Sequence, residues 1–261
     1  MLRGLYTAYS GMINEQNRMD ILTNNLANSA TVGYKKEGST SEAFQELLSY
    51  RIKDLTDATS AAAVGYMAPG VKIGETYTDF SQGSFKITEN TYDLALSGEG
   101  FFAIEYTNKA GETTTMYTRE GAFTLTDDGY LVNDNGDYVL GRTADGGTTR
   151  IQLDPTQETS IDQAGQISQN QVVIAQLEIT DFADYNYLEH YGETYFQPVE
   201  GAELIESNAK VFSGYLEASN VNVVDEMVQL INVTRAYESN QKIIQAYDES
   251  LEQSVSLGRL S

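Results

Sequence analysis

The sequence predicts an α+β protein in which long N- and C-terminal helices pair as a coiled-coil-like layer around a central, inserted all-β domain. Two observations carry this prediction: a sevenfold apolar repeat at each end of the chain, and strand-like, glycine-rich sequence between the repeats. The expected organisation is a helix and elbow over 1–34, a connector over 35–75, a β-rich domain over 76–215 and a second helix over 216–261.

The N-terminal repeat consists of apolar residues spaced by seven, namely Leu5, Met12, Met19 and Leu26. Only four of the first 30 residues are charged, and the other outward positions are mostly Asn, Gln, Ser and Thr. An uncharged polar face favours burial among neighbouring helices, where amides can pair but ions would lose their hydration. An ordinary amphipathic helix folded back on the β-domain remains an open alternative.

The C-terminal repeat is longer and has the same spacing, through Val223, Leu230, Tyr237, Ile244 and Leu251. Ser219 or Asn220 is the expected N-cap of this helix, and Asp225 and Glu226 suit its first turns, where the helix dipole favours negative charge. Matching repeats at opposite ends of one chain allow the two helices to pair with each other.

The central segment is rich in Thr, Tyr, Val, Ile and Phe, often alternating with polar residues, which is typical of strands. Asp128-Gly129 and Asn135-Gly136 are two-residue hairpin signals within it. The connector over 35–75 is expected to begin with a short helix over 41–55 and to continue as a loop. Most glycines and all the prolines lie between the terminal repeats: Pro69, Pro155 and Pro198.

The amino-acid composition and net charge argue against several classes of binding partner. The chain has 261 residues with 38 acidic and 16 basic side chains, a formal charge of -22, which disfavours nucleic acid and anionic membrane surfaces. It contains no cysteine, and no run approaches the roughly 20 apolar residues of a membrane span. The first 20 residues lack an apolar core and a cleavage site of a secretory signal, so no cleavable signal peptide is expected.

No segment contains a recognisable catalytic or cofactor-binding motif. The acidic residues at 127–128 and 133–137 are more simply turn residues than a catalytic carboxylate pair. The G-x-G at 98–100 lacks the third glycine and the following helix of a dinucleotide site. His190 is the single histidine of the chain and is expected to be a structural or surface residue. The sequence therefore predicts no catalytic residue, no metal site, no cofactor and no small-molecule substrate.

Several segments resemble the bacterial flagellar basal-body rod and hook proteins. They are MLRGLYTAYSGM, NNLANSATVGYKK, DLALSGEGFFAIE with YTREGAFTLTDDGYLV, and the C-terminal GYLEASNVNVVDEMVQLINVTRAYESNQKIIQAYDESL. The resemblance runs from end to end. It implies that the terminal helices form the inner tube of a hollow helical polymer and that the β-domain forms its outer layer.

The resemblance also implies partners and a location. The chain is expected in the flagellar basal body, as a structural subunit of the rod that transmits torque from motor to hook, assembled with itself and with other rod and hook proteins. Export would use the flagellar type III apparatus without cleavage. The residues expected to carry self-assembly are those of the two sevenfold repeats, together with Asn28 and Gly33.

The chain has no room for the further outer domain of hook proteins, which favours a rod subunit, whereas proximal and distal rod members are not distinguished. Two other classes stay open: a β-rich surface-binding or adhesin-like protein with helical oligomerisation ends, and a wall-cleaving enzyme. Either would need features absent from the sequence, an anchoring signal for the first and a carboxylate-lined cleft for the second.

Residues 24–36, NNLANSATVGYKK, then suggest an elbow between the two layers. Leu26 continues the apolar repeat, Asn28 and the small residues after it end the helix, and Gly33 allows a left-handed backbone where the chain turns. Lys35 and Lys36 are expected to be exposed, so their replacement should cost less than about 1 kcal/mol. An ordinary helix C-cap is the simpler interpretation of the same residues.

Overall fold

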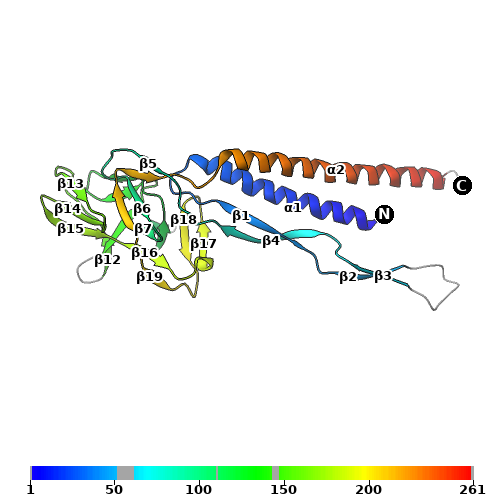
Figure 1. The fold of residues 1–261 in the computed structure, drawn as a ribbon, viewed down its shortest axis with the longest axis horizontal. Coiled ribbons are helices and arrows are strands. Elements are labelled where there is room, and N and C mark those ends of the chain that lie inside the picture. Colours follow the sequence, from blue (N-terminus) through cyan, green and yellow to red (C-terminus); the bar gives the residue numbers. More distant parts are fainter. Residues whose placement is uncertain (1, 52–61, 110, 143–146, 260–261) are drawn as a thin grey trace. The chain divides into compact units, whose positions relative to one another are not determined.

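The computed structural model describes residues 2–51, 62–109, 111–142 and 147–259 of the chain. It divides into two compact units (Figure 1). The helical unit comprises Met1–Ala27, Glu37–Thr78 and Asn222–Ser261, and the β unit comprises Asn28–Lys36 and Asp79–Val221. The predicted α+β class, with a helix at each end and strands between, is confirmed.

The helical unit is built on two long helices, α1 (Leu2–Ala27) and α2 (Val223–Arg259), which pack side by side (Figure 1). Its strands form two antiparallel ribbons. One ribbon pairs β1 (Glu37–Ala43) with β4 (Val71–Thr78), and the other pairs β2 (Leu47–Arg51) with β3 (Ala62–Met67). The pairing of the two terminal helices with each other agrees with the expectation from their repeats.

The helix expected over 41–55 is wrong. Residues 41–43 end strand β1 and residues 47–51 form β2. Residues 41–43 pair with β4, whose sequence VKIGETYT is rich in residues that favour strands, and residues 47–51 pair with β3. These two pairings override the helical preference of the segment. The remaining residues of the expected helix, 52–55, and the first part of the expected loop lie outside the described residues. The loop expected after them is wrong at 62–67, which form strand β3.

The N-cap of α2 also differs from the prediction. The backbone N–H of Val224 donates to Asn222 Oδ1 at 3.1 Å, and the N–H of Glu226 donates to the Asn222 carbonyl at 3.0 Å. Asn222 is therefore the cap, in the usual geometry in which a side-chain oxygen satisfies a free N–H of the first turn. Ser219 and Asn220 lie before the helix, and Asn220 has other partners described below.

The β unit contains most of the strands, all joined in antiparallel pairs. Its largest sheet runs in the order β13-β14-β15-β11-β7-β8-β18-β17, and β9, β10, β12, β16 and β19 pair beside this path. Short 3₁₀ turns occur at Asn28–Ala30 and Tyr185–Tyr187. The strands are β5 (Phe85–Ile87), β6 (Leu94–Ser97), β7 (Phe101–Thr107), β8 (Thr113–Thr118), β9 (Phe123–Leu125), β10 (Leu131–Asn133), β11 (Tyr138–Arg142), β12 (Thr148–Arg150), β13 (Thr159–Ile161), β14 (Gln166–Gln169), β15 (Val172–Leu177), β16 (Ile179–Phe182), β17 (Leu188–Tyr191), β18 (Tyr195–Pro198), β19 (Leu204–Glu206), β20 (Lys210–Ser213) and β21 (Tyr215–Glu217).

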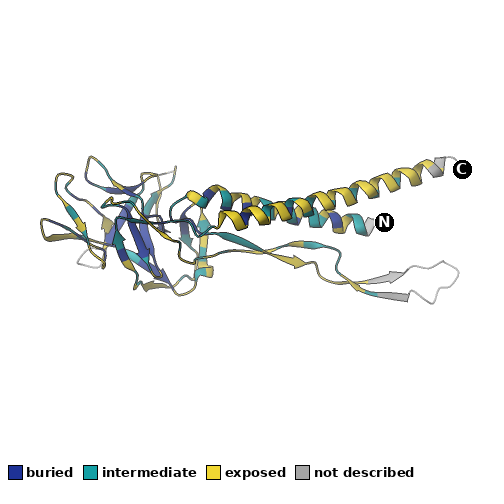
Figure 2. Cartoon of the chain, turned by 45° about the horizontal axis from the view of Figure 1, so that its top comes forward, coloured by how far each residue is buried: buried dark blue, intermediate teal, exposed yellow. Residues whose placement is uncertain are grey.

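The core of the β unit lies on both faces of strand β7, because successive side chains of a strand point to opposite faces. Phe102 belongs to a cluster with Leu94, Phe123 and other aliphatic residues. Phe101 and Ala103 point the other way, into an aromatic cluster that includes Phe196. Figure 2 shows buried residues concentrated in these strands, whereas α2 is exposed along much of its length.

Both predicted hairpin turns are confirmed, although each connection is longer than two residues. Strands β9 and β10 are joined by residues 126–130, and Gly129 adopts φ +84°. Strands β10 and β11 are joined by residues 134–137, and Gly136 adopts φ +87°. Longer hairpin loops of this kind still need one residue with positive φ, which glycine provides.

Candidate functional site: the helix pair and the elbow

Close packing of α1 against α2 depends on two glycines of α1. A Cβ atom at Gly4 would lie 2.2 Å from the hydroxyl of Tyr247, and one at Gly11 would lie 3.1 Å from the amide nitrogen of Asn240. Each glycine thus accommodates a larger side chain of α2. Because the two glycines are seven residues apart, they lie on nearly the same face of α1.

The residues of the sevenfold repeats lie on these paired helices but are only partly covered. Val223, at the start of α2, is 41% exposed. The remaining repeat residues are half-buried: Leu5, Met12, Met19, Leu26, Leu230, Tyr237, Ile244 and Leu251. The helix pair of one chain therefore leaves part of the apolar repeat accessible, and the role of these residues in self-assembly stays a prediction.

The buried amides of α1 pair with strand β1 and with α2. Asn25 is fully buried; its Nδ2 donates to the Glu37 carbonyl at 2.8 Å and to Glu226 Oε2 at 3.4 Å, and its Oδ1 accepts from the Glu37 N–H at 2.9 Å. Asn14 is also buried and contacts the Ser41 hydroxyl at 3.2 Å. The uncharged polar residues of α1 thus serve, at these positions, to attach a β ribbon within one chain.

The elbow, residues 28–36, is part of the β unit, and Gly33 is its tightest point. Gly33 adopts φ +69°, and its N–H donates to the Glu217 carbonyl at 2.8 Å. A Cβ atom there would lie 2.4 Å from the backbone nitrogen of Glu120 and 2.5 Å from the carbonyl carbon of Arg119. Only glycine satisfies both the left-handed backbone and this close approach of two main chains.

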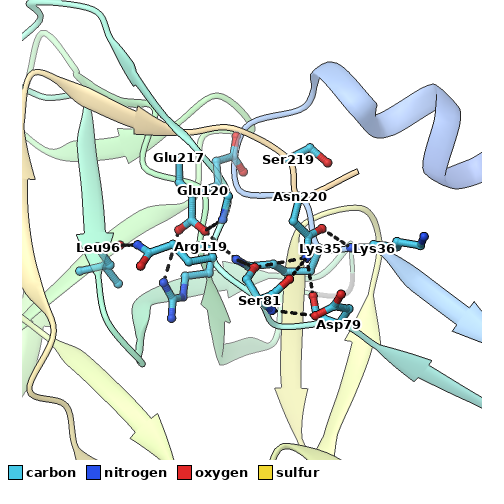
Figure 3. A network of polar contacts seen from close by, with 12 residues as sticks. Lys35, Lys36, Asp79, Ser81, Leu96, Arg119, Glu120, Glu217, Ser219 and Asn220 are labelled. Carbon is cyan, nitrogen blue, oxygen red and sulfur yellow. Dashed lines mark hydrogen bonds and ion pairs between the residues drawn. The ribbon is translucent and has the colours of Figure 1, made fainter. Parts of the chain in front are cut away.

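Lys35 is buried, contrary to the expectation that it is exposed. Its side chain is 1% exposed, and Nζ donates to Glu217 Oε1 at 2.6 Å and to the Ser81 carbonyl at 2.9 Å (Figure 3). Burial lowers the pKa of Lys35 below its ordinary value, and the neighbouring Glu217 carboxylate opposes that shift. The expectation failed because Lys35 meets a carboxylate 182 positions later in the chain.

Glu217 is the centre of this network, which we call the elbow network: Lys35, Arg119 and Glu217. Arg119 Nη1 lies 3.3 Å from Glu217 Oε2, and its Nη2 donates to the Gly98 carbonyl at 2.7 Å. The backbone N–H of Gly83 donates to Glu217 Oε1 at 2.9 Å. A fully buried carboxylate thus has two cations and a backbone donor as partners, as a buried charge requires.

Asn220 attaches the end of the elbow to the segment that leaves the β unit. Its Oδ1 accepts from the Lys36 N–H at 2.8 Å, and its Nδ2 donates to the Asp79 carbonyl at 2.7 Å. The Asp79 N–H in turn donates to the Lys36 carbonyl at 2.8 Å. Three chain segments, at 36, 79 and 220, are therefore joined side by side in the β unit (Figure 3).

Aromatic packing completes the elbow. Tyr34 is fully buried, with its ring edge-on to His190 at 6.4 Å between ring centres, and His190 packs edge-on against Phe196 at 5.3 Å. The single histidine of the chain thus packs against two aromatic rings. Asn28 is also buried, and its carbonyl accepts from the Thr31 N–H at 3.2 Å where α1 gives way to a 3₁₀ turn.

The described residues include no group of three or more histidine and carboxylate side chains placed to hold a metal ion. Within the same described ranges, none of the helices is both long and apolar enough to cross a membrane.

Comparisons with known proteins match this architecture from end to end. Residues 5–35 match the family described as "Flagella basal body rod protein", residues 95–169 the "Flagellar hook protein FlgE/F/G D1 domain", and residues 213–257 the "Flagellar basal body rod FlgEFG protein C-terminal". The flagellar basal-body rod protein FlgG of Bacillus subtilis is 34% identical, over 99% of this chain and all of that protein. This chain belongs to the flagellar basal-body rod protein family.

Two further relatives of the rod family span similar lengths. FlgG of Caulobacter vibrioides is 33% identical over 96% of this chain and 97% of its own length. FlgF of Mesorhizobium japonicum is 29% identical over 98% of this chain and 97% of its own length. The chain is thus a structural rod subunit of the flagellar basal body and not an enzyme, and the adhesin-like alternative is not supported.

Two residues of the elbow network in this rod subunit were missed at the sequence level. Arg119 precedes Glu120 in YTREGAF, and Glu217 is the single charge of GYLEASN; both lie beside strand-forming residues. A charge in such a context is a weak signal of a buried partner, since most charged side chains face solvent. Their pairing needed the contact between strand β21 and the loop after β8, which no local pattern encodes.

A buried carboxyl next to the elbow predicts a pH dependence of stability for the rod subunit. Burial raises the pKa of Glu120 above its ordinary value, and the hydrogen bond from Thr194 Oγ1 to its Oε2, at 2.9 Å, opposes the shift. The folded chain holds this proton more tightly than the unfolded chain. The contribution of Glu120 is therefore full below its ordinary pKa and is lost as pH rises through the folded value.

Glu120→Gln should accordingly raise stability relative to the natural chain, and the gain should grow between pH 4 and pH 8. The amide keeps an oxygen for Thr194 but carries no charge to desolvate. Urea unfolding of both chains across that pH range measures the difference. Glu189→Gln, at an exposed position on β17, is the control and should show a flat difference. A pH-independent difference for Glu120→Gln would contradict the assignment.

Proposed function

We propose that this rod subunit polymerises helically with itself and with other rod and hook proteins, through α1 and α2, into the drive shaft that transmits torque from motor to hook. The observation that carries the proposal is the apolar surface that the helix pair leaves exposed. Tyr6 and Tyr9 on α1 and Met227 and Ile231 on α2 are among the large apolar side chains exposed there. Several large apolar side chains exposed on the same pair of helices favour association with another protein surface.

The elbow network supports the transmission of torque. The chain passes between the two units after residues 27, 36, 78 and 221, and hydrogen bonds of Glu217, Asn220 and Asp79 join the segments next to these connections within the β unit. A load applied through one of the connections is therefore shared with the others. The buried ion pairs of Lys35 and Arg119 with Glu217 restrict the geometry of this junction.

We also propose that export uses the flagellar type III apparatus without removal of the N-terminus. Residues Leu2–Ala27 form α1, which packs against α2 and holds strand β1 through Asn14 and Asn25. Cleavage within this segment would remove half of the helix pair. The proposed polymer therefore needs the N-terminal segment in place.

Ile244→Asp tests the role of the sevenfold repeat in polymerisation. Ile244 is half-buried on α2, so an aspartate there places an unpartnered charge in the apolar repeat, at a cost of about 3 kcal/mol or more. Subunit recovered in purified basal bodies and the radius of swimming in soft agar should both fall to background.

Gln245→Asp is the matched control, since it adds the same charge at the next, exposed position of α2 and should assemble and swim normally. Secretion of both variants is measured separately, so that an export defect is not mistaken for an assembly defect. Normal swimming of the Ile244→Asp strain would overturn the role of the repeat.

A further inference from the structure

An apolar groove lies between α1 and the β1–β4 ribbon of the helical unit. Its volume is about 690 Å³, and it is lined chiefly by apolar side chains. Three of these, Tyr6, Tyr9 and Ile13, are between 38% and 64% exposed. The groove is large enough to hold several side chains of a partner helix.

The walls of the groove are held in place by hydrogen bonds within the unit. Thr7 Oγ1 donates to the Pro69 carbonyl at 2.9 Å, and the Val71 N–H donates to Ser10 Oγ at 3.4 Å. These contacts attach the ribbon to α1 while Tyr9 and Ile13 remain uncovered. The groove is thus formed before any partner binds, which lowers the entropic cost of binding.

The first turns of α2 carry an apolar stripe that matches such a groove. Val224, Met227, Val228 and Ile231 follow the i, i+3, i+4, i+7 spacing with which an amphipathic helix anchors in a hydrophobic groove. All four are between 50% and 68% exposed. The stripe spans about 11 Å along the helix and the α1 wall of the groove about 16 Å, at 1.5 Å per residue.

The charges at the two surfaces are complementary. Lys72 is the one charged side chain that lines the described groove; it is about half exposed at the rim, where its Nζ also lies 3.1 Å from Oε2 of the exposed Glu42 of the same chain. The segment of α2 from 223 to 234 contains Asp225 and Glu226 but no lysine or arginine. Glu226 is buried, so Asp225 is the exposed acid beside the stripe.

The stripe and the groove cannot meet within one chain. Gly4 and Gly11 face α2, whereas Tyr6 and Ile13 lie two positions further, which is about 200° around α1. On α2, the buried Glu226 and Val233 mark the covered side, and Val228 lies about 200° from Glu226. The groove and the stripe therefore lie on opposite outer sides of the helix pair.

We propose that the groove between α1 and the β1–β4 ribbon receives the Val224–Ile231 stripe of a second copy of this chain. The inference rests on the proposed polymerisation and specifies its contact. A groove on one side and the stripe that fills it on the other make a head-to-tail interface, which does not close on a dimer and which extends as a filament where the rotation between copies closes no ring. Lys72 of one copy then lies near Asp225 of the next.

Disulfide cross-linking tests this contact directly, because the natural chain has no cysteine. A chain with both Ile13→Cys and Val228→Cys serves as the sole copy in cells, and basal bodies purified from them are treated with a mild oxidant. The expected result is a ladder of covalent oligomers on a non-reducing gel. The two single-cysteine chains should give no oligomer above a dimer.

Ile13→Cys with Val255→Cys is the matched control, since Val255 is at least as exposed as Val228 but lies far along α2, and it should give no ladder. Assembled rods without a ladder, or with dimers alone, would overturn the groove contact and leave the proposed polymerisation standing. Another occupant of the groove, such as a different segment or a small apolar molecule, would give that result. Failure of the natural chain to appear in basal bodies would overturn both.

A charge exchange decides the same question without cysteines. Lys72→Glu should raise the concentration needed for polymerisation of the purified chain by up to about fivefold, the effect of one exposed ion pair. Adding Asp225→Lys to that chain should restore the natural value. No effect of Lys72→Glu, or no restoration by the second change, would count against the contact.

Discussion

A valine in place of Gly33 is expected to destabilise the β unit by about 4 kcal/mol or more and to abolish assembly. Two costs add at this position. A β-branched residue is strongly disfavoured at φ +69°, and its Cβ would collide with the main chain at Arg119 and Glu120. Main-chain atoms held in a sheet connection cannot move aside as a flexible side chain can. Near-UV circular dichroism during urea unfolding measures the loss of stability.

Gly192→Val separates these two costs. Gly192 has nearly the same backbone angle, φ +71°, but its Cβ position has open space around it. This control should cost about 1–2 kcal/mol, which is the backbone strain alone. Equal losses for the two variants would show that the close approach of residues 119–120 is unimportant for the elbow.

Lys35→Ala is expected to cost about 3–5 kcal/mol, the loss observed when one partner of a buried ion pair is removed. The variant leaves the buried Glu217 carboxylate with Arg119 as its remaining cation and leaves the Ser81 carbonyl without this donor. The same urea unfolding measurement applies, together with subunit recovery in basal bodies. This expectation replaces the mild effect that the sequence suggested for both lysines.

Lys36→Ala is the matched control, because Lys36 is half-exposed and its main-chain hydrogen bonds to Asn220 and Asp79 persist in alanine. It should cost less than about 1 kcal/mol. In a double-mutant cycle, Lys35→Ala combined with Glu217→Gln should cost less than the sum of the two single changes, since the amide needs no cation. Additive losses would show that the two residues are not coupled.

The sequence by itself determined the terminal helices, the β-rich middle and the position of the turn at Gly33. These features follow from local patterns: a sevenfold repeat for each helix, alternation for strands such as β7, and a glycine where the backbone must be left-handed. The resemblance to rod proteins likewise rests on short segments, located near both ends and in the middle of the chain. Periodicity and turn chemistry act over a few residues, so one sequence suffices to detect them.

Only the tertiary structure decided which residues of the elbow are charged partners and how the connector folds. Lysine is a residue type usually found at the surface, and the burial of Lys35 depends on its ion pair with Glu217, which lies 182 positions later in the chain. The segment 41–51 forms strands because β4 pairs with β1 and β3 with β2, against its own helical preference. Both outcomes arise from contacts between segments that are distant in the sequence. The free energy of these contacts outweighs the local propensity of each segment, and a short sequence pattern contains no information about them.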